Sequence, residues 1–282
     1  MNTRTDTRIG TGARRRLATA TALLGALLLA GCSSTQSPPA ATESTDDSAL
    51  TGQLTIYAAA SLTEAFDELA TQFEAANPGV EVVPITYDGS SVLATQLIGG
   101  APADVFASAD QKNMQKVVDA GLADEPVDFA TNVLQIAVAP GNPLGITGLA
   151  DLADGVKTRA DGSPASVVLC APDVPCGAAS KTLIDAAGIT VTPVSEEQNV
   201  TSVLTKVKSG EADAGLVYVT DVTAAGDAVE GVAIEGADAA TNVYPVTSLK
   251  AAANPEAAAA FVAFVTSAEG QQLLDSYGFG AP

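Results

Sequence analysis

The sequence contains no histidine and is poor in basic residues. Among its 282 residues, 33 are acidic and only 13 are lysine or arginine, which gives a formal net charge of −20. Without histidine, the chain lacks the general base that most often activates a serine or cysteine nucleophile. The scarcity of lysine and arginine leaves no basic patch, which excludes nucleic acid as a partner. The charge is typical of a soluble, monomeric protein.

Cysteine is also scarce, and the first of the three cysteines follows an export signal. Several arginines precede an apolar stretch at 17–30, which has signal-peptide length and is too short to span a membrane. The stretch ends in LAGC at 29–32, which resembles the lipobox of bacterial lipoproteins. The resemblance implies that residues 1–31 are a lipoprotein signal peptide and that Cys32 is acylated. The alternative is an ordinary secretory signal with a chance cysteine.

Residues 32–49 have the composition of a flexible linker. They are rich in serine, threonine, proline and acid and have no large apolar residue, so they cannot contribute to a core. Loss of residues 1–31 would take away five arginines and one aspartate and leave a net charge of −24. The folded part is expected to begin near Leu50, on the outer face of the cytoplasmic membrane, with the lipid as its only membrane contact.

The other two cysteines, Cys170 and Cys176, lie close together in VLCAPDVPCG. Five residues separate them, two of them prolines, and disulfides persist in exported proteins. We therefore predict a bridge between them. A metal-binding pair is the alternative, but the chain has neither histidine nor a second cysteine pair to complete it.

Strand-like and helix-like segments alternate along the chain. The apolar, strand-like segments are 53–59, 80–88, 103–109, 133–140, 166–171, 189–194, 212–220, 231–236 and 242–249. The helix-like segments are 62–76, 91–100, 110–121, 148–155, 177–188, 200–210 and 255–278, the last with a break at Gly270. Strands with near-continuous apolar runs predict an α/β fold of mostly parallel sheets flanked by helices.

Small or hydroxyl residues occupy four of the strand-to-helix junctions. Ser61 has Glu64 three residues later, which predicts a capping box. The other three junctions are 89–91, 176–177 and 199–200. In open α/β sheets ligands bind at such junctions, where helix N-termini offer free N–H groups and partial positive charge. The junctions therefore predict an anion site, unless the serines are only helix caps.

Four segments resemble the molybdate-binding proteins of bacterial molybdate ABC transporters. They are YAAASLTEAFDELATQFE, YDGSSVLATQLIGGAPADVFASADQKNM, APDVPCGAASKTLI and AGLVYVTD, and they stand in the same order as in that family. The resemblance covers about residue 53 to the end. It implies a type II periplasmic-binding-protein fold with the ligand cleft between two lobes. Lobe 1 would be 50–134 plus 240–282, and lobe 2 would be 135–239.

The family's ligand positions fall on five residues of this chain. The resemblance implies that Ser61 and Ser90 give hydroxyl and backbone N–H groups, that Cys176 and Val200 give backbone N–H groups, and that Tyr218 gives its hydroxyl. Where some relatives have a run of serines, this chain has Asp88-Gly89-Ser90-Ser91. That difference leaves Ser91 as an alternative to Ser90, and Asp88 is expected to point away from the anion.

Molybdate is a dianion without a proton, so a site made only of hydrogen-bond donors suits it. The expected function is capture of molybdate, and of tungstate, for delivery to an ABC permease, with no cofactor and no free-cation site. Another tetrahedral oxyanion such as sulfate is the alternative ligand. A hydrolase using Ser61 or Ser90 lacks both a base and a G-x-S-x-G elbow. A metal-ion site built on Tyr218 and carboxylates would need a second, clustered tyrosine.

Overall fold

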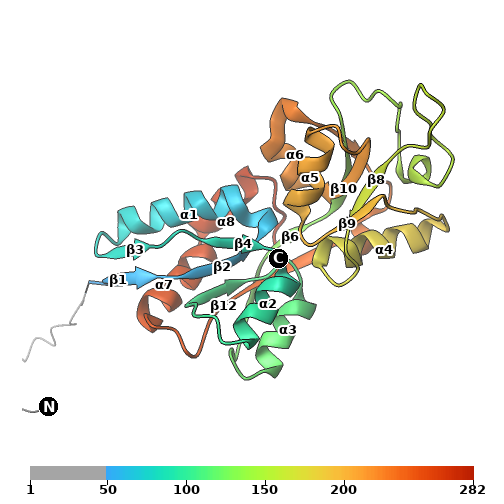
Figure 1. Ribbon diagram of the computed structural model, residues 1–282. Coiled ribbons are helices and arrows are strands. Elements are labelled where there is room, and N and C mark those ends of the chain that lie inside the picture. The colour runs from blue at the N-terminus through green and yellow to red at the C-terminus, as the bar shows by residue number, and fades with distance from the viewer. Residues whose placement is uncertain (1–48) are drawn as a thin grey trace, which may run out of the picture. The chain divides into compact units, whose positions relative to one another are not determined.

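The computed structural model describes residues 49–282. The predicted signal peptide, Cys32 and nearly all of the predicted linker lie outside the described residues. Among the described helices, none is both long enough and apolar enough to cross a membrane. The predicted α/β class is confirmed, because helices flank two sheets (Figure 1).

The first sheet has the strand order β4-β2-β5-β12-β6. β2 runs parallel to both β4 and β5, and β12 is antiparallel to β5 and β6. Its strands are β2 (Ile56–Ala59), β4 (Thr86–Asp88), β5 (Val105–Ala107), β6 (Val127–Asn132) and β12 (Asn242–Ser248). A short parallel pair, β1 (Gly52–Leu54) with β3 (Val80–Val82), precedes it. We call this sheet and its helices lobe 1.

The second sheet has the order β11-β7-β10-β8-β9. β8 runs parallel to β9 and β10, and β7 is antiparallel to β10 and β11. Its strands are β7 (Leu134–Val138), β8 (Val167–Cys170), β9 (Ser195–Glu197), β10 (Ala214–Tyr218) and β11 (Glu230–Ala233). We call this sheet and its helices lobe 2. Each of these sheets thus has four strands that run in the same direction and one strand that runs against them.

The chain passes between the lobes at two places in the described residues. Only Val133 separates β6 of lobe 1 from β7 of lobe 2. The return follows the short 3₁₀ helix η4 (Ala237–Ala240) and enters β12. β7 and β12 are the strands that run against their neighbours, so the antiparallel strand of each sheet is the one entered directly from the other lobe.

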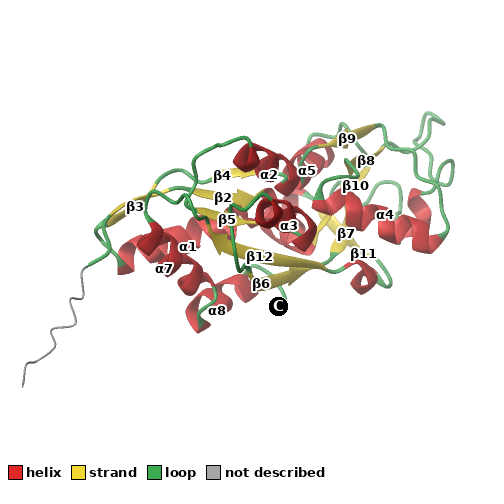
Figure 2. Cartoon of the chain, turned by 90° about the horizontal axis from the view of Figure 1, so that it is seen from below, coloured by secondary structure: helices red, strands yellow, loops and turns green. Residues whose placement is uncertain are grey.

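Helices cover both faces of the lobe 1 sheet. α1 (Thr63–Ala76), α7 (Pro255–Val265) and α8 (Ala268–Ser276) pack on one face, and α2 (Ser90–Ile98) and α3 (Gln111–Asp119) pack on the other (Figure 2). The helices of lobe 2 are α4 (Pro175–Ala187), α5 (Val200–Lys208) and α6 (Val219–Ala225). Short 3₁₀ helices are η1 (Ala60–Leu62), η2 (Leu149–Leu152) and η3 (Gly226–Ala228).

Several predicted segments differ from the structure for local reasons. The predicted strand 80–88 is divided into β3 and β4 around Pro84, which has no N–H to give to a ladder. The strand predicted at 189–194 lies instead at Ser195–Glu197. The break predicted at Gly270 comes earlier, because Ser267 caps α8 by accepting from the Gly270 N–H. Gly270 lies inside α8, where a Cβ would stand 2.3 Å from the Phe264 carbonyl oxygen.

Candidate functional site

A small pocket lies where the two lobes meet. All five residues predicted to hold a ligand line it, together with neighbours from both lobes. The lining residues are Ala59, Ala60, Ser61, Asp88, Gly89, Ser90 and Ala109 of lobe 1, and Pro175, Cys176, Asn199, Val200 and Tyr218 of lobe 2. The fold therefore brings together positions that are up to 159 residues apart in the chain, from Ala59 to Tyr218.

Most of the pocket wall consists of the first residues of helices. Ser90 is the first residue of α2, Val200 is the first of α5, and Cys176 is the second of α4 after Pro175. The first N–H groups of an α-helix have no partner within the helix and carry partial positive charge. Three helix N-termini from two lobes thus face one small volume, an arrangement suited to an anion.

Ser61 does not act as the predicted helix cap. Residues 60–62 form the 3₁₀ helix η1, α1 begins at Thr63, and no side chain caps it. The Ser61 hydroxyl instead lies 2.9 Å from the Tyr244 hydroxyl, in a buried contact between η1 and β12. The predicted capping box is wrong because a partner 183 residues away in the chain takes the serine hydroxyl.

Tyr244 is the residue near the site that the sequence did not reveal. It is fully buried in β12. Its ring also packs edge-to-face against the ring of Tyr218, with 6.0 Å between the ring centroids. Tyr244 thus contacts one candidate ligand residue from each lobe. An isolated tyrosine in an apolar strand carries no signal of this role.

The structure places Ser90, and not Ser91, on the pocket wall. The Ser90 hydroxyl accepts a hydrogen bond of 2.9 Å from the Ala109 N–H, in the loop after β5. One of its lone pairs is therefore occupied, and its own proton remains to be donated. The Ser91 hydroxyl is buried without a hydrogen-bond partner in the described part of the chain.

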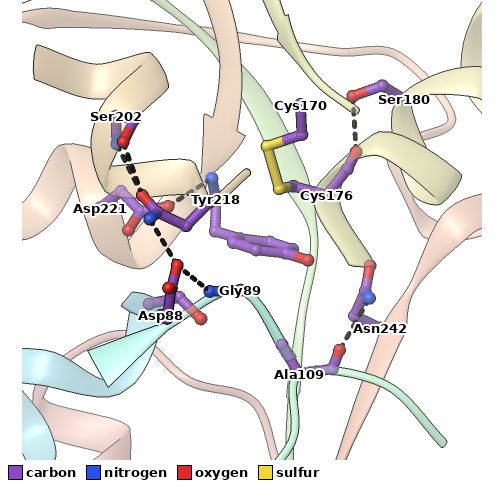
Figure 3. Close-up of a disulfide and its surroundings, with 12 residues drawn as sticks. Asp88, Gly89, Ala109, Cys170, Cys176, Ser180, Ser202, Tyr218, Asp221 and Asn242 are labelled. Carbon is purple, nitrogen blue, oxygen red and sulfur yellow. Dashed lines mark hydrogen bonds between the residues drawn. A yellow bond between two sulfur atoms is a disulfide. The ribbon is translucent and has the colours of Figure 1, made fainter. Parts of the chain in front are cut away.

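Tyr218 is buried at the end of β10 and points into the site (Figure 3). Its hydroxyl has no hydrogen-bond partner among the described residues. Burial raises the pKa of this phenol well above its ordinary value, so the group keeps its proton as a donor. A buried polar atom without a partner is costly, which makes this hydroxyl the clearest pointer to a bound ligand.

Asp221 fixes the backbone behind Tyr218. Its carboxylate accepts a hydrogen bond of 2.8 Å from the Tyr218 N–H (Figure 3). Burial raises the pKa of the Asp221 carboxyl to about 7, while the Tyr218 N–H opposes the shift and the charge of Glu64 adds to it. The carboxyl belongs to the first turn of α6, so it holds the start of that helix against the end of β10.

Cys170 and Cys176 form a disulfide, which Figure 3 shows beside Tyr218. The bridge ties the end of β8 to the first turn of α4. The next residue, Gly177, lies so close to the preceding loop that a Cβ would stand 1.9 Å from the Ala171 carbonyl oxygen. The covalent bridge and this close contact both fix the helix end that carries the Cys176 N–H.

Asp88 lies on the pocket wall, where its carboxylate is bound by N–H donors. One of its carboxylate oxygens accepts from the Gly89 N–H and from the Asn199 side-chain amide, each at 2.8 Å. Asn199 belongs to lobe 2, so this hydrogen bond joins the lobes. The sequence showed the acidic residue but not its distant amide partner.

The wall contains no lysine or arginine among the described residues, and Asp88 is its one carboxylate. Its other polar side chains are the hydroxyls of Ser61, Ser90 and Tyr218 and the amide of Asn199, beside backbone N–H groups. Such a site can hold an anion by hydrogen bonds and helix dipoles without a formal positive charge.

Residues 54–280 match the family model described as "Bacterial extracellular solute-binding protein". The chain belongs to this family. A curated relative, molybdate-binding protein ModA of Mycobacterium tuberculosis, is 45% identical to this solute-binding protein over 269 residues, which cover 95% of this chain and all of the relative. The resemblance to molybdate-binding proteins predicted from the motifs is confirmed by this match.

Solved structures of solute-binding proteins have the same fold. The substrate-binding domain of a molybdenum ABC transporter protein from Clostridium difficile is 27% identical, with a TM-score of 0.58, over 82% of this chain and 99% of that one. The periplasmic molybdate-binding protein of Azotobacter vinelandii has a TM-score of 0.67 at 22% identity, over 81% of this chain and 99% of that one. The second likeness concerns the fold alone.

Proposed function

We propose that this solute-binding protein captures molybdate, and tungstate as well, and delivers it to an ABC permease. The observation that carries the proposal is the buried Tyr218 hydroxyl, which has no partner among the described residues and faces a pocket formed by helix N-termini. The similarity to the molybdate-binding protein of Mycobacterium tuberculosis supports the choice of ligand.

The ligand is held by neutral donors. Ser61 and Ser90 give hydroxyl and N–H groups, Cys176 and Val200 give N–H groups, and Tyr218 gives its hydroxyl. The Ala109 N–H already occupies a lone pair of Ser90, which supports a donor role for that hydroxyl. The Tyr244 hydroxyl lies 2.9 Å from that of Ser61, and we take Tyr244 as the donor in this contact. Both serines then offer a proton to the ligand, as an oxyanion without protons requires.

The two lobes, 50–134 plus 240–282 and 135–239, enclose the ligand by rotating about the crossings next to Val133 and after Ala240. Closure excludes water and lowers the local dielectric constant, which strengthens each hydrogen bond. Cys32 anchors the protein, a monomer, to the outer face of the membrane, and residues 32–49 give it reach to the permease. The relatives named above are described as binding proteins, which supports a role without catalysis.

Calorimetric titration of the purified protein with molybdate, tungstate, sulfate and phosphate tests the proposal. Molybdate and tungstate are expected to bind tightly and phosphate weakly, because phosphate at neutral pH carries a proton that needs an acceptor. Heat with sulfate but none with molybdate would assign the site to sulfate instead.

A Tyr218→Phe variant tests whether the Tyr218 hydroxyl binds the ligand. It removes only the hydroxyl that lacks a partner, so molybdate affinity should fall by about 1.5–3 kcal/mol, the range for a hydrogen bond to a charged group. The stability of the ligand-free variant should not fall, because no protein hydrogen bond is lost. Unchanged affinity would remove Tyr218 from the ligand set.

A further inference from the structure

Two short segments, one from each lobe, meet at the edge of the pocket. Asp88 and Gly89 connect β4 to α2 in lobe 1, and Gln198 and Asn199 connect β9 to α5 in lobe 2. These segments directly precede candidate ligand residues, Ser90 in lobe 1 and Val200 in lobe 2. Any movement of one lobe against the other must change the distance between these segments.

The first contact between these segments is a charge-assisted hydrogen bond. The Asn199 amide donates to a carboxylate oxygen of Asp88 at 2.8 Å, and the Gly89 N–H donates to the same oxygen. The Asn199 carbonyl oxygen is used as well, because it caps α5 by accepting from the N–H and the hydroxyl of Ser202. Asn199 therefore organises the start of α5 with its carbonyl oxygen and holds lobe 1 with its amide nitrogen.

The second contact is steric and independent of the first. A Cβ at Gly89 would lie 2.0 Å from the Gln198 carbonyl oxygen and 3.3 Å from the Val174 side chain, both in lobe 2. The backbone at Gly89 has φ −60° and ψ 136°, which any residue can adopt. The glycine is thus required by the opposite lobe and not by its own backbone conformation.

We propose that Asp88, Gly89, Gln198 and Asn199 form a clasp that holds the lobes closed and sets how long the ligand is retained. Asp88 is then a positioning residue, since its carboxylate acts through Asn199 and the start of α5. This role explains why a carboxylate is tolerated beside an anion site: two N–H donors bind it, and the hydrogen bond across the cleft offsets its repulsion of the ligand. The proposal rests on oxyanion capture as the function.

The test compares two variants of the full chain that remove the same charge. Asp88→Asn keeps a carbonyl oxygen that can accept from Asn199, whereas Asp88→Ala has no acceptor. Molybdate release, followed by dilution of protein loaded with radioactive molybdate, should be about tenfold faster in Asp88→Ala than in Asp88→Asn. If Asp88 only repels the anion, the two variants will release molybdate at the same slow rate, and the clasp is refuted.

Gly89→Ala tests the steric contact without changing any charge. Its methyl group should keep the lobes apart and speed the release of molybdate by about tenfold or more. Gly148→Ala is the matched control, because a Cβ there meets nothing within 4 Å and the backbone is extended. Wild-type release from Gly89→Ala would overturn the proposal.

Hydrogen exchange separates failure of the clasp from failure of the proposed function. In ligand-free protein, backbone amides of the two clasp segments should exchange faster in Gly89→Ala than in Gly148→Ala, whatever the ligand is. If the wild type does not bind molybdate but this difference is present, the proposed function fails and the clasp stands. Equal exchange in the two variants would refute the clasp.

Discussion

At the scale of single residues, the site depends on which atoms of each hydroxyl are already occupied. Ser61 and Ser90 look alike in the sequence, since each follows a strand and precedes a helical segment. In the structure, Ser90 accepts from the Ala109 N–H, whereas Ser61 contacts the Tyr244 hydroxyl. Each contact uses one hydrogen-bonding position of the serine hydroxyl and leaves another free for a ligand. In the described part of the chain, neither serine hydroxyl is hydrogen-bonded to a carboxylate or a lysine.

The contact between Ser61 and Tyr244 predicts non-additive effects on binding. Ser61→Ala should weaken molybdate binding by about 1.5–3 kcal/mol. Tyr244→Phe should also weaken it, because Ser61 loses the group that orients its proton. The double variant should bind about as weakly as Ser61→Ala alone, as calorimetry of a double-mutant cycle would show.

The matched control is Tyr87→Phe, which removes a tyrosine hydroxyl bonded to Thr63 and Asp67 away from the pocket. Its effect on affinity should be small and should add to that of Ser61→Ala. Full additivity between Ser61→Ala and Tyr244→Phe would contradict the proposed orientation.

The buried carboxyl of Asp221 predicts a pH dependence of stability. Its pKa is about 7 in the folded protein against an ordinary value of 3.8, so the folded state keeps a proton that the unfolded state releases between these values. The stabilisation that this bound proton gives to the folded state is complete below about pH 4 and is lost as the pH rises to about 7. Between these two pH values, the free energy of unfolding should fall by up to about 1.4 kcal/mol for each pH unit.

Chemical unfolding of the wild type and Asp221→Asn between pH 4 and 8 measures this effect. Asparagine keeps an oxygen for the Tyr218 N–H but does not titrate, so the difference between the two curves isolates the carboxyl. Parallel curves across this range would show that Asp221 is ionised throughout.

At the scale of elements, helix starts determine the site, and the sequence placed them well. The ends of strands and the first turns of helices follow from local patterns, so the junctions near residues 61, 90, 176 and 200 could be predicted, whereas α6 after Tyr218 could not. Local patterns missed β6 altogether, did not separate β3 from β4, and placed β9 too early in the chain. The pairing of β12 with β5 and β6 brings Tyr244 to Ser61 and had no local signal.

Removing the disulfide should weaken one of these helix starts. A Cys170→Ser/Cys176→Ser variant loses a bridge across a short loop, which is expected to cost about 2 kcal/mol of stability. The first turn of α4 would also gain freedom, so molybdate should bind more weakly. Thermal melting and calorimetry would check both effects, and an unaltered melting temperature together with unaltered affinity would refute the role of the bridge.

At the scale of the whole molecule, a strongly acidic chain is proposed to bind a dianion. The net charge of −20 repels such a ligand at long range, while attraction comes only from the groups of the pocket wall. Salt screens the long-range repulsion, with a screening length of about 8 Å at physiological ionic strength. Short, buried hydrogen bonds are screened much less.

Association and dissociation should therefore respond differently to salt. The association rate of molybdate should rise as sodium chloride is raised from about 10 to about 150 mM, whereas the dissociation rate should change little. Stopped-flow measurement of tyrosine fluorescence, with sodium chloride as the only variable, would test this. An association rate that falls with salt would reveal a local positive field that dominates the total charge.

The sequence by itself determined the α/β class and the positions of the junction residues, because alternation of apolar segments and the residues that begin helices are local properties. The motifs also pointed to the ligand family. Only the tertiary structure decided which partner each polar atom takes. Ser61 contacts Tyr244 across 183 residues and Asp88 accepts from Asn199 across 111 residues. A hydrogen bond needs atoms about 3 Å apart, and that distance depends on how the two lobes pack.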